Sequence, residues 1–438
     1  MGEFTKTATR PQHHARGGAR RDRRSIRVVA SAVILTLVAA ACGSSGSGSS
    51  GPATTAPVVP QQAAYEAPGP YVPGVTQLNM NGRRVEVWYP ADRGAEAGKA
   101  KDVFSISGLL PDNLKSIVPA DIDPHYTTDA YRDIKASTKG PFPIVLFSHG
   151  YAGYPTLYAF LTTHLASWGF IVVAPDHNER GLLAALTQCV KPADDAAVLL
   201  AARDLVVAQS KDPTALLHNT ADPTKVATVG HSAGAAAAMT AANDPSVATF
   251  VALDGAGVRS SSATPPETTA DGCIVRPTTT TTAAGATTST APPTTIAAGD
   301  IPQKPGMIIT GGNDAVIPLD RLRPVYDQMA DPKRLVVIDG AGHNSVTDIC
   351  LIGADQGGLI KIAAKVGIQV PEQLAVLFED GCDTTKGYPA PKQVWEVPRH
   401  FVVAQLRWVF GIDPEPVGLG PGIADAFPPL RLDYEFTN

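Results

Sequence analysis

The sequence lacks the residue patterns that usually bind zinc or a dinucleotide. It contains no H-E-x-x-H motif, and its five cysteines are not spaced as paired zinc ligands. A G-x-G-x-x-G string does occur at residues 46–51, but no predicted strand precedes it and no predicted helix follows it. We therefore predict a protein that needs neither a metal ion nor a nucleotide cofactor.

Positive charge is scarce over most of the chain. The net charge is −5, but residues 1–42 hold eight Lys and Arg against two Asp and Glu, which leaves a net charge of −11 on the remainder. A folded domain with this excess of negative charge is unsuited to nucleic acid or to an anionic surface. We expect no nucleic-acid partner.

The apolar run from Val28 to Ala41 is too short to cross a bilayer, which takes about 20 residues in a helix. It follows an arginine-rich segment and ends in small residues directly before Cys42. Such an order predicts a secretory signal. A cysteine at this place resembles the lipobox of bacterial lipoproteins, which implies that Cys42 carries lipid; an ordinary signal peptide with an incidental cysteine is the alternative.

These features predict the domain organisation. Residues 1–42 form a lipoprotein signal, and residues 43–64, rich in Gly, Ser, Thr and Pro, form a flexible tether. Residues 65–438 form one large folded domain, in which residues 257–303 are a Thr-, Ala- and Pro-rich insertion, expected to be a mobile loop. The protein is expected to be extracytoplasmic, either anchored to the cell membrane or secreted.

Predicted strands and helices alternate along the domain. An Asn81-Gly82 turn between two alternating segments predicts a hairpin. The order that follows predicts an α/β fold with a mainly parallel sheet and helices on both faces. The expected strands are residues 143–147, 170–174, 226–229, 249–253, 307–310 and 335–338, and the expected helices are residues 157–168, 192–209, 319–329 and 398–410.

The chemistry centres on residues 225–239. A buried strand there turns at once into a helix of small residues, and Gly230-His231-Ser232-Ala233-Gly234 at the turn is a G-x-S-x-G motif. Such a turn strains the serine backbone and presents its hydroxyl above the sheet. Gly230 and Gly234 are expected because a Cβ atom at either position would collide with the neighbouring strand or helix. Ser232 is the predicted nucleophile.

Serine needs a base, which a third group must orient. Asp314 follows the predicted strand 307–310, and His343 follows the next strand. The order Ser, Asp, His is that of α/β-hydrolases, with all three at the same edge of a parallel sheet. The oxyanion would be bound by the backbone N–H groups of Ala233 and of Tyr151. Tyr151 is nominated because the His-Gly pair before it, in the loop after strand 143–147, resembles the oxyanion loop of esterases. We assign structural roles to the nearby histidines His149, His177 and His231.

Residues 143–176, 222–256 and 305–350 resemble the α/β-hydrolase superfamily, and most of all the bacterial cutinase-like polyester hydrolases and the platelet-activating-factor acetylhydrolases. The resemblance implies an α/β-hydrolase fold, and Tyr151 falls where the polyester hydrolases have an aromatic residue that contacts substrate. Their tryptophan after strand 249–253 falls near Ala256 here, and the insertion has no counterpart.

The resemblance leaves two candidates for the acid. The cutinase-like enzymes take it from a G-x-x-D context that Gly311-Gly-Asn-Asp314 matches, whereas the acetylhydrolases take it from about the position of Asp254. We predict Asp314, with Asp254 as the alternative.

Four cysteines follow Cys42, and an even number in an oxidising compartment predicts two disulfides with three possible connectivities. Cys350 lies seven residues after His343, so a Cys350–Cys382 bond would brace the loop that carries the base. We predict that bond and a Cys189–Cys273 bond.

The predicted function is hydrolysis of carboxylic esters by a lipid-anchored serine hydrolase through an acyl-enzyme. Its expected partners are a small-molecule or lipid ester and, through the anchor, a membrane; the protein is expected to be a monomer. One alternative is an acyltransferase with the same triad and a cell-envelope acceptor. The other is a non-catalytic surface-binding protein of the same fold.

Overall fold

The computed structural model describes residues 62–437 except 111–112, 258–266 and 276–299. Its main sheet consists of β1 (Val72–Met80), β2 (Arg83–Ala91), β5 (Tyr131–Arg132), β6 (Phe142–Ser148), β7 (Ile171–Pro175), β8 (Ala221–His231), β9 (Val247–Leu253), β10 (Gly306–Gly311), β11 (Lys333–Ile338) and β12 (Leu432–Thr437). The strand order is β12-β11-β10-β9-β8-β6-β7-β2-β1-β5. The strands from β7 to β11 in this order are parallel, which confirms the predicted mainly parallel sheet.

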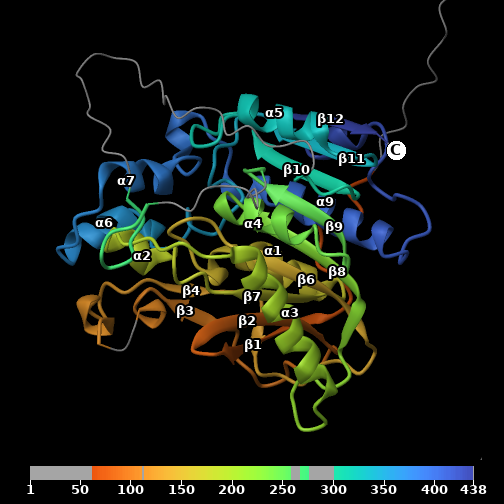
Figure 1. The fold of residues 1–438 in the computed structure, drawn as a ribbon, viewed down its shortest axis with the longest axis horizontal. Coiled ribbons are helices and arrows are strands. Elements are labelled where there is room, and N and C mark those ends of the chain that lie inside the picture. The colour runs from red at the N-terminus through yellow and green to blue at the C-terminus, as the bar shows by residue number, and fades with distance from the viewer. Residues whose placement is uncertain (1–61, 111–112, 258–266, 276–299, 438) are drawn as a thin grey trace, which may run out of the picture. The chain divides into compact units, whose positions relative to one another are not determined.

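Helices cover both faces of this sheet (Figure 1). The α-helices are α1 (Ala159–Ser167), α2 (Leu182–Leu186), α3 (Asp195–Lys211), α4 (Ala233–Ala241), α5 (Leu319–Gln328), α6 (Leu359–Lys365), α7 (Glu372–Glu379), α8 (Pro391–Val394) and α9 (Glu396–Val409). One hydrophobic core joins α1 and α9 to one face, and a second joins α3, α4 and α5 to the other. Burial on both faces explains why β6 is apolar along nearly all its length.

The predicted hairpin is confirmed at β1 and β2, which pair antiparallel from Val72–Ala91 to Met80–Arg83. Asn81 and Gly82 between them have φ of 53° and 85°. Both residues of a two-residue turn of this kind need positive φ, which Asn and Gly adopt most readily.

Element boundaries differ from the sequence expectation where side-chain capping decides them. The helix expected from Pro192 begins at Asp195, because the Asp194 carboxylate accepts a 3.0 Å hydrogen bond from the Ala197 N–H and caps the helix there. The stretch of residues 91–140, which has no periodicity, contains the small β3–β4 sheet (Val103–Ser105 with His125–Thr127) and the 3₁₀ turns Ser107–Leu109 and Lys115–Ile117.

Both predicted disulfides are present, Cys189–Cys273 and Cys350–Cys382. Most of the insertion at residues 257–303 lies outside the described residues, but its residues 267–275 include a bridge between Thr268 and Ile274 and carry Cys273. The signal, Cys42 and residues 43–61 of the tether also lie outside the description. In the part of the chain that is described, no helix has both the length and the hydrophobicity to span a bilayer.

Candidate active site

The G-x-S-x-G motif forms the turn between β8 and α4. Ser232 has φ of 56° and ψ of −121°, a conformation that costs a non-glycine residue energy. A Cβ atom on Gly230 would come within 2.0 Å of the Gly234 carbonyl oxygen, and one on Gly234 within 2.0 Å of the Ser148 oxygen on β6. The glycines therefore allow the turn to pack between helix and strand, as the sequence predicts.

The turn brings Ser232 to the two residues predicted to act with it. Its Oγ lies 2.9 Å from His343 Nε2, and His343 Nδ1 lies 2.8 Å from Asp314 Oδ2. Asp314 and His343 are buried, and the Ser232 side chain reaches a pocket with about 320 Å³ of empty space that is partly open to solvent. Three groups separated by 111 and 29 residues thus form one hydrogen-bonded chain.

Asp314 is held so that one oxygen faces the imidazole. Its Oδ1 accepts hydrogen bonds from the N–H groups of Val316 and Ile317, at 2.8 and 2.7 Å, which leaves Oδ2 for His343. Nδ1 therefore carries the proton, and Nε2 is left to accept one from Ser232.

Asp254, the alternative acid, is directed elsewhere. Its Oδ1 accepts hydrogen bonds from the Gly311 N–H at 2.7 Å and the Thr310 hydroxyl at 3.2 Å, and so joins the ends of β9 and β10. Burial, and next the charge of Asp314, raise the pKa of the Asp254 carboxyl well above its usual range. A carboxyl whose charged form is disfavoured in this way, and whose oxygen is bonded to the end of β10, is poorly suited to stabilise an imidazolium.

The residues nominated for the oxyanion hole lie on two different segments near the serine. Tyr151 lines the same pocket as Ser232 and His343. Ala233 is the first residue of α4, where the N–H groups have no acceptor within the helix. The two backbone donors come from segments that the parallel pairing of β6 with β8 brings together.

His231 connects the two sides of the pocket. Its Nε2 donates to the His343 carbonyl at 2.9 Å, so its Nδ1 accepts from the Tyr158 hydroxyl at 2.9 Å. Tyr158 in turn accepts a 3.0 Å hydrogen bond from the Gly150 N–H. Burial, and next the charge of His343, hold the pKa of His231 well below its usual range. This neutral histidine links the loop of Tyr151 to the backbone of the base.

Arg180, which the sequence analysis did not single out, fixes the peptide before Tyr151. Its Nη1 donates to the carbonyl oxygens of His149 and Gly150, at 2.6 and 2.9 Å. His149 Nδ1 donates to the same Gly150 oxygen at 2.8 Å. Because the C=O and N–H of a trans peptide point in opposite directions, this arrangement aims the Tyr151 N–H away from Arg180. A polar run after β7, Asp176-His-Asn-Glu-Arg180, is the only hint of this in the sequence.

Beneath this loop lies a second group of a serine, a histidine and an aspartate. Ser148 Oγ is 2.9 Å from His177 Nε2, and His177 Nδ1 is 3.1 Å from Asp195 Oδ1. The last two atoms are buried, and their orientation makes no hydrogen bond. Ser148 is fully buried and also accepts from Arg180 Nη2 at 3.0 Å. Burial lowers the pKa of His177 to about 3. Closed off from the pocket, this group supports the Tyr151 loop.

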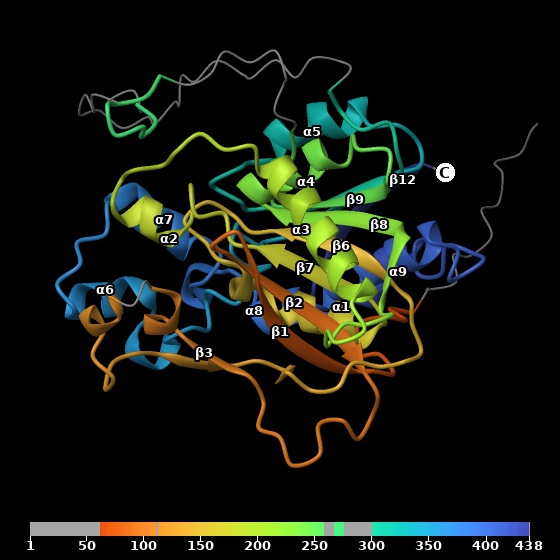
Figure 2. The same ribbon diagram turned by 60° about the horizontal axis from the view of Figure 1, so that its bottom comes forward.

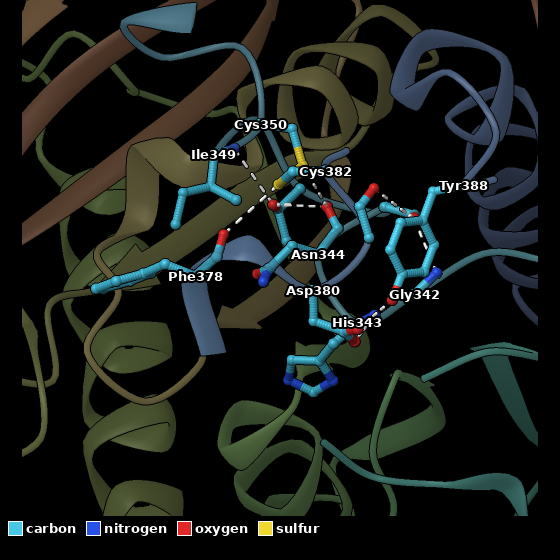
Figure 3. Close-up of a disulfide and its surroundings, with 12 residues drawn as sticks. Gly342, His343, Asn344, Ile349, Cys350, Phe378, Asp380, Cys382 and Tyr388 are labelled. Carbon is cyan, nitrogen blue, oxygen red and sulfur yellow. Dashed lines mark hydrogen bonds between the residues drawn. A yellow bond between two sulfur atoms is a disulfide. The ribbon is translucent and has the colours of Figure 1, made fainter. Parts of the chain in front are cut away.

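Asp380 is a further residue that the sequence analysis missed. Its Oδ2 accepts hydrogen bonds from the backbone N–H groups of His343 at 2.7 Å and Ala315 at 3.3 Å, and its Oδ1 accepts from the Tyr388 hydroxyl at 2.7 Å. Figure 3 shows it between His343 and Tyr388, close to the Cys350–Cys382 bond. The only signal for Asp380 in the sequence is its position two residues before Cys382, which the predicted Cys350–Cys382 bond places near His343.

In the described ranges, no group of three or more His, Cys, Asp or Glu side chains is arranged to hold a metal ion. The chemistry described above can proceed with side chains and backbone alone.

Comparison with known proteins agrees with this geometry. The family model for chlorophyllase matches residues 131–349, which is half of the chain. The chain belongs to the chlorophyllase family. Members of this α/β-hydrolase family are carboxylic ester hydrolases, and the α/β-hydrolase fold and this enzyme class predicted from the sequence are confirmed. The matched range of the chlorophyllase model contains Ser232, Asp314 and His343.

A solved structure with the same fold is the ferulic acid esterase from Streptomyces cinnamoneus. It superposes with a TM-score of 0.51 at 18% identity, over 87% of this chain and 100% of that chain. At this identity the likeness establishes the fold alone.

Proposed function

We propose that this chlorophyllase-family hydrolase cleaves carboxylic esters through an acyl-enzyme on Ser232. The observation that carries the proposal is the continuous chain from Ser232 Oγ to His343 Nε2 and from His343 Nδ1 to Asp314 Oδ2. Ser232 also lies at a strained turn and lines a pocket. Ser148 does not line that pocket.

In the proposed mechanism, Ser232 Oγ attacks the ester carbonyl while His343 Nε2 takes its proton. Asp314 keeps the imidazole in the tautomer that can accept this proton and stabilises the charged ring. The N–H groups of Tyr151 and Ala233 bind the oxyanion. His343 then donates the proton to the departing alcohol, and water, activated by the same histidine, hydrolyses the acyl-enzyme.

We further propose that the enzyme works outside the cytoplasm, anchored by lipid on Cys42. The order of basic segment, apolar run and cysteine supports this location, and two disulfides are compatible with an oxidising compartment. Mass spectrometry of the membrane fraction should yield an acylated peptide beginning at Cys42. A soluble mature form that begins elsewhere would contradict the anchor.

The catalytic proposal is tested by labelling with a fluorophosphonate probe and by release of 4-nitrophenol from 4-nitrophenyl acetate. Wild type and Ser148→Ala should both be labelled and active, whereas Ser232→Ala should lose both labelling and activity. Loss of labelling and activity in Ser148→Ala but not in Ser232→Ala would mean that Ser148, in the second group, is the nucleophile. Absence of labelling in folded wild type would favour a binding protein.

Hydrolysis is distinguished from acyl transfer by product analysis with a sugar acceptor present. Free acid as the main product supports the hydrolase, and an acylated sugar as the main product supports the transferase. Either reaction should be abolished in Ser232→Ala.

A further inference from the structure

A second cavity adjoins the pocket of Ser232. It has about 660 Å³ of empty space, counting the part open to solvent, and it shares Leu157, Ile349 and Phe378 with the Ser232 pocket. The three shared side chains are apolar and border both spaces, so the cavity lies directly beside the pocket of the nucleophile.

The walls of this cavity offer almost no polar group. Every lining side chain is aliphatic or aromatic, and the Tyr154 hydroxyl is the one polar side-chain group among those described. A carboxylate, phosphate or sugar inside would lose its water without gaining a partner. Polar groups, including Asn344 and Thr347, gather instead in the Ser232 pocket. The two spaces therefore suit the two parts of one molecule, a polar ester and a hydrocarbon chain.

The cavity is built by segments outside the main sheet. Leu182 and Leu186 of α2 form one wall, and Leu359, Ile362 and Ala363 of α6 form another. Figures 1 and 2 both show α2, α6 and α7 close together. Several lining residues, among them Leu359 and Ala363, are only half-buried. Covering this accessible apolar surface with a hydrocarbon removes it from water, which is favourable.

We propose that this cavity binds the hydrocarbon chain of the ester substrate, so that the enzyme prefers long-chain over short-chain esters. The proposal rests on the function proposed for Ser232. The chain can belong to the acyl group or to the alcohol, and both place the same chemistry in the same cavity.

Two series of esters test this. One varies the acyl chain of 4-nitrophenyl esters, and the other varies the alcohol of alkyl acetates. Burial of each methylene should raise kcat/KM about fourfold until the cavity is full. The rise should appear in the series whose variable part enters the cavity, and thereby identify that part.

Variants of α6 link the rise to the cavity. Ala363→Phe should fill the cavity and abolish the dependence on chain length, while 4-nitrophenyl acetate is hydrolysed at the wild-type rate. Ala364→Phe is the matched control, since Ala364 is the exposed neighbour on the same helix. Val370→Phe, between α6 and α7, is a second blocking variant in case the first does not fold.

Three outcomes would overturn the proposal. If wild type hydrolyses acetates through Ser232 but gains nothing from longer chains in either series, the cavity does not bind the chain, and the proposed function still stands. Equal chain-length dependence in wild type, Ala363→Phe and Val370→Phe would rule out chain binding in the cavity as well. Wild type without activity on any ester would contradict the proposed function, and this proposal with it.

Discussion

Asp380 Oδ2 accepts a 2.7 Å hydrogen bond from the backbone N–H of His343, the residue whose imidazole contacts Ser232. The same oxygen accepts from the N–H of Ala315, the residue after Asp314. One buried carboxylate therefore holds both loops on which the base and the acid depend. Neither contact involves the imidazole itself, so Asp380 acts on the position of the triad.

We predict that Asp380→Ala lowers kcat/KM about 10- to 100-fold, the usual cost of losing a group that positions a functional residue. Asp380→Asn should retain much more activity, because its amide oxygen can still accept from the His343 N–H. Steady-state kinetics on 4-nitrophenyl acetate measure both variants. Glu379→Ala, exposed in the same segment, is the control. Full activity in a folded Asp380→Ala would contradict this role.

The two candidate acids should differ by orders of magnitude. Asp314→Asn removes the charge and tautomer control at His343 Nδ1 and should lower kcat about 10⁴-fold. Asp254→Asn leaves His343 untouched and should cost at most about 10- to 100-fold, since Asp254 binds the end of β10. Both variants are compared on one short-chain ester after their folding is checked by circular dichroism. A larger loss in Asp254→Asn would reverse the assignment of the acid.

How far the sequence could predict this site depends on how local each signal is. The nucleophile turn is specified within five residues, because Gly230 and Gly234 leave no room for a Cβ atom. Asp314 and His343 could be placed because parallel strands carry their loops to the same edge of the sheet. Asp380 lies 37 residues after His343 in no recognisable motif, and its role depends on the packing of the segment after α7.

How much of the fold could be predicted also depends on how local each signal is. The parallel strands were predictable since burial on both faces makes them apolar throughout. Helices α6 and α7 were not predicted, because they follow no strand and pack over the site rather than onto the sheet. The cavity that they form could not have been inferred from periodicity.

Arg180 should matter for the transition state more than for substrate binding. Arg180→Gln removes the bidentate hold on the carbonyls of His149 and Gly150 and frees the Tyr151 peptide to rotate. Loss of one oxyanion donor costs about 10²- to 10³-fold in kcat, so we expect a fall in kcat approaching 10²-fold with KM little changed. Arg203→Gln on α3 is the control for loss of an arginine. An effect on KM alone would contradict the prediction.

The two disulfides should both stabilise the fold, but only one should affect catalysis. For loops with sequence separations of 32 and 84, chain entropy predicts a loss of about 4 kcal/mol on removing either bond. The Cys350→Ala/Cys382→Ala double variant should also lower kcat on 4-nitrophenyl acetate, because the bond braces the segments of His343 and Asp380. The Cys189→Ala/Cys273→Ala variant should keep wild-type kcat. Urea unfolding and steady-state kinetics are measured at the same temperature. Equal kcat in the two variants would mean that the Cys350–Cys382 bond does not affect catalysis.

Asp348 should make stability depend on pH. Its carboxyl is buried under α1, where Oδ2 accepts from the Phe160 N–H at 2.9 Å and Oδ1 accepts from the Tyr126 hydroxyl at 2.7 Å. Burial raises its pKa to about 7, against 3.8 for the unperturbed group, despite these hydrogen bonds and the charge of Arg399. Between these values the folded state keeps a proton that the unfolded state releases. The contribution of Asp348 to the free energy of unfolding is therefore complete below about pH 4 and is lost as the pH rises to 7.

Asp348→Asn carries no such proton and keeps an oxygen for the Phe160 N–H. The free energy of unfolding of wild type minus that of Asp348→Asn should therefore be about 3 kcal/mol larger at pH 5 than at pH 8. Urea unfolding at the two pH values measures the difference, with Asp355→Asn, exposed a few residues later, as the control. A difference that is the same at both pH values would mean that Asp348 is ionised throughout. In that case the hydrogen bonds from Phe160 and Tyr126 outweigh the cost of burying its charge.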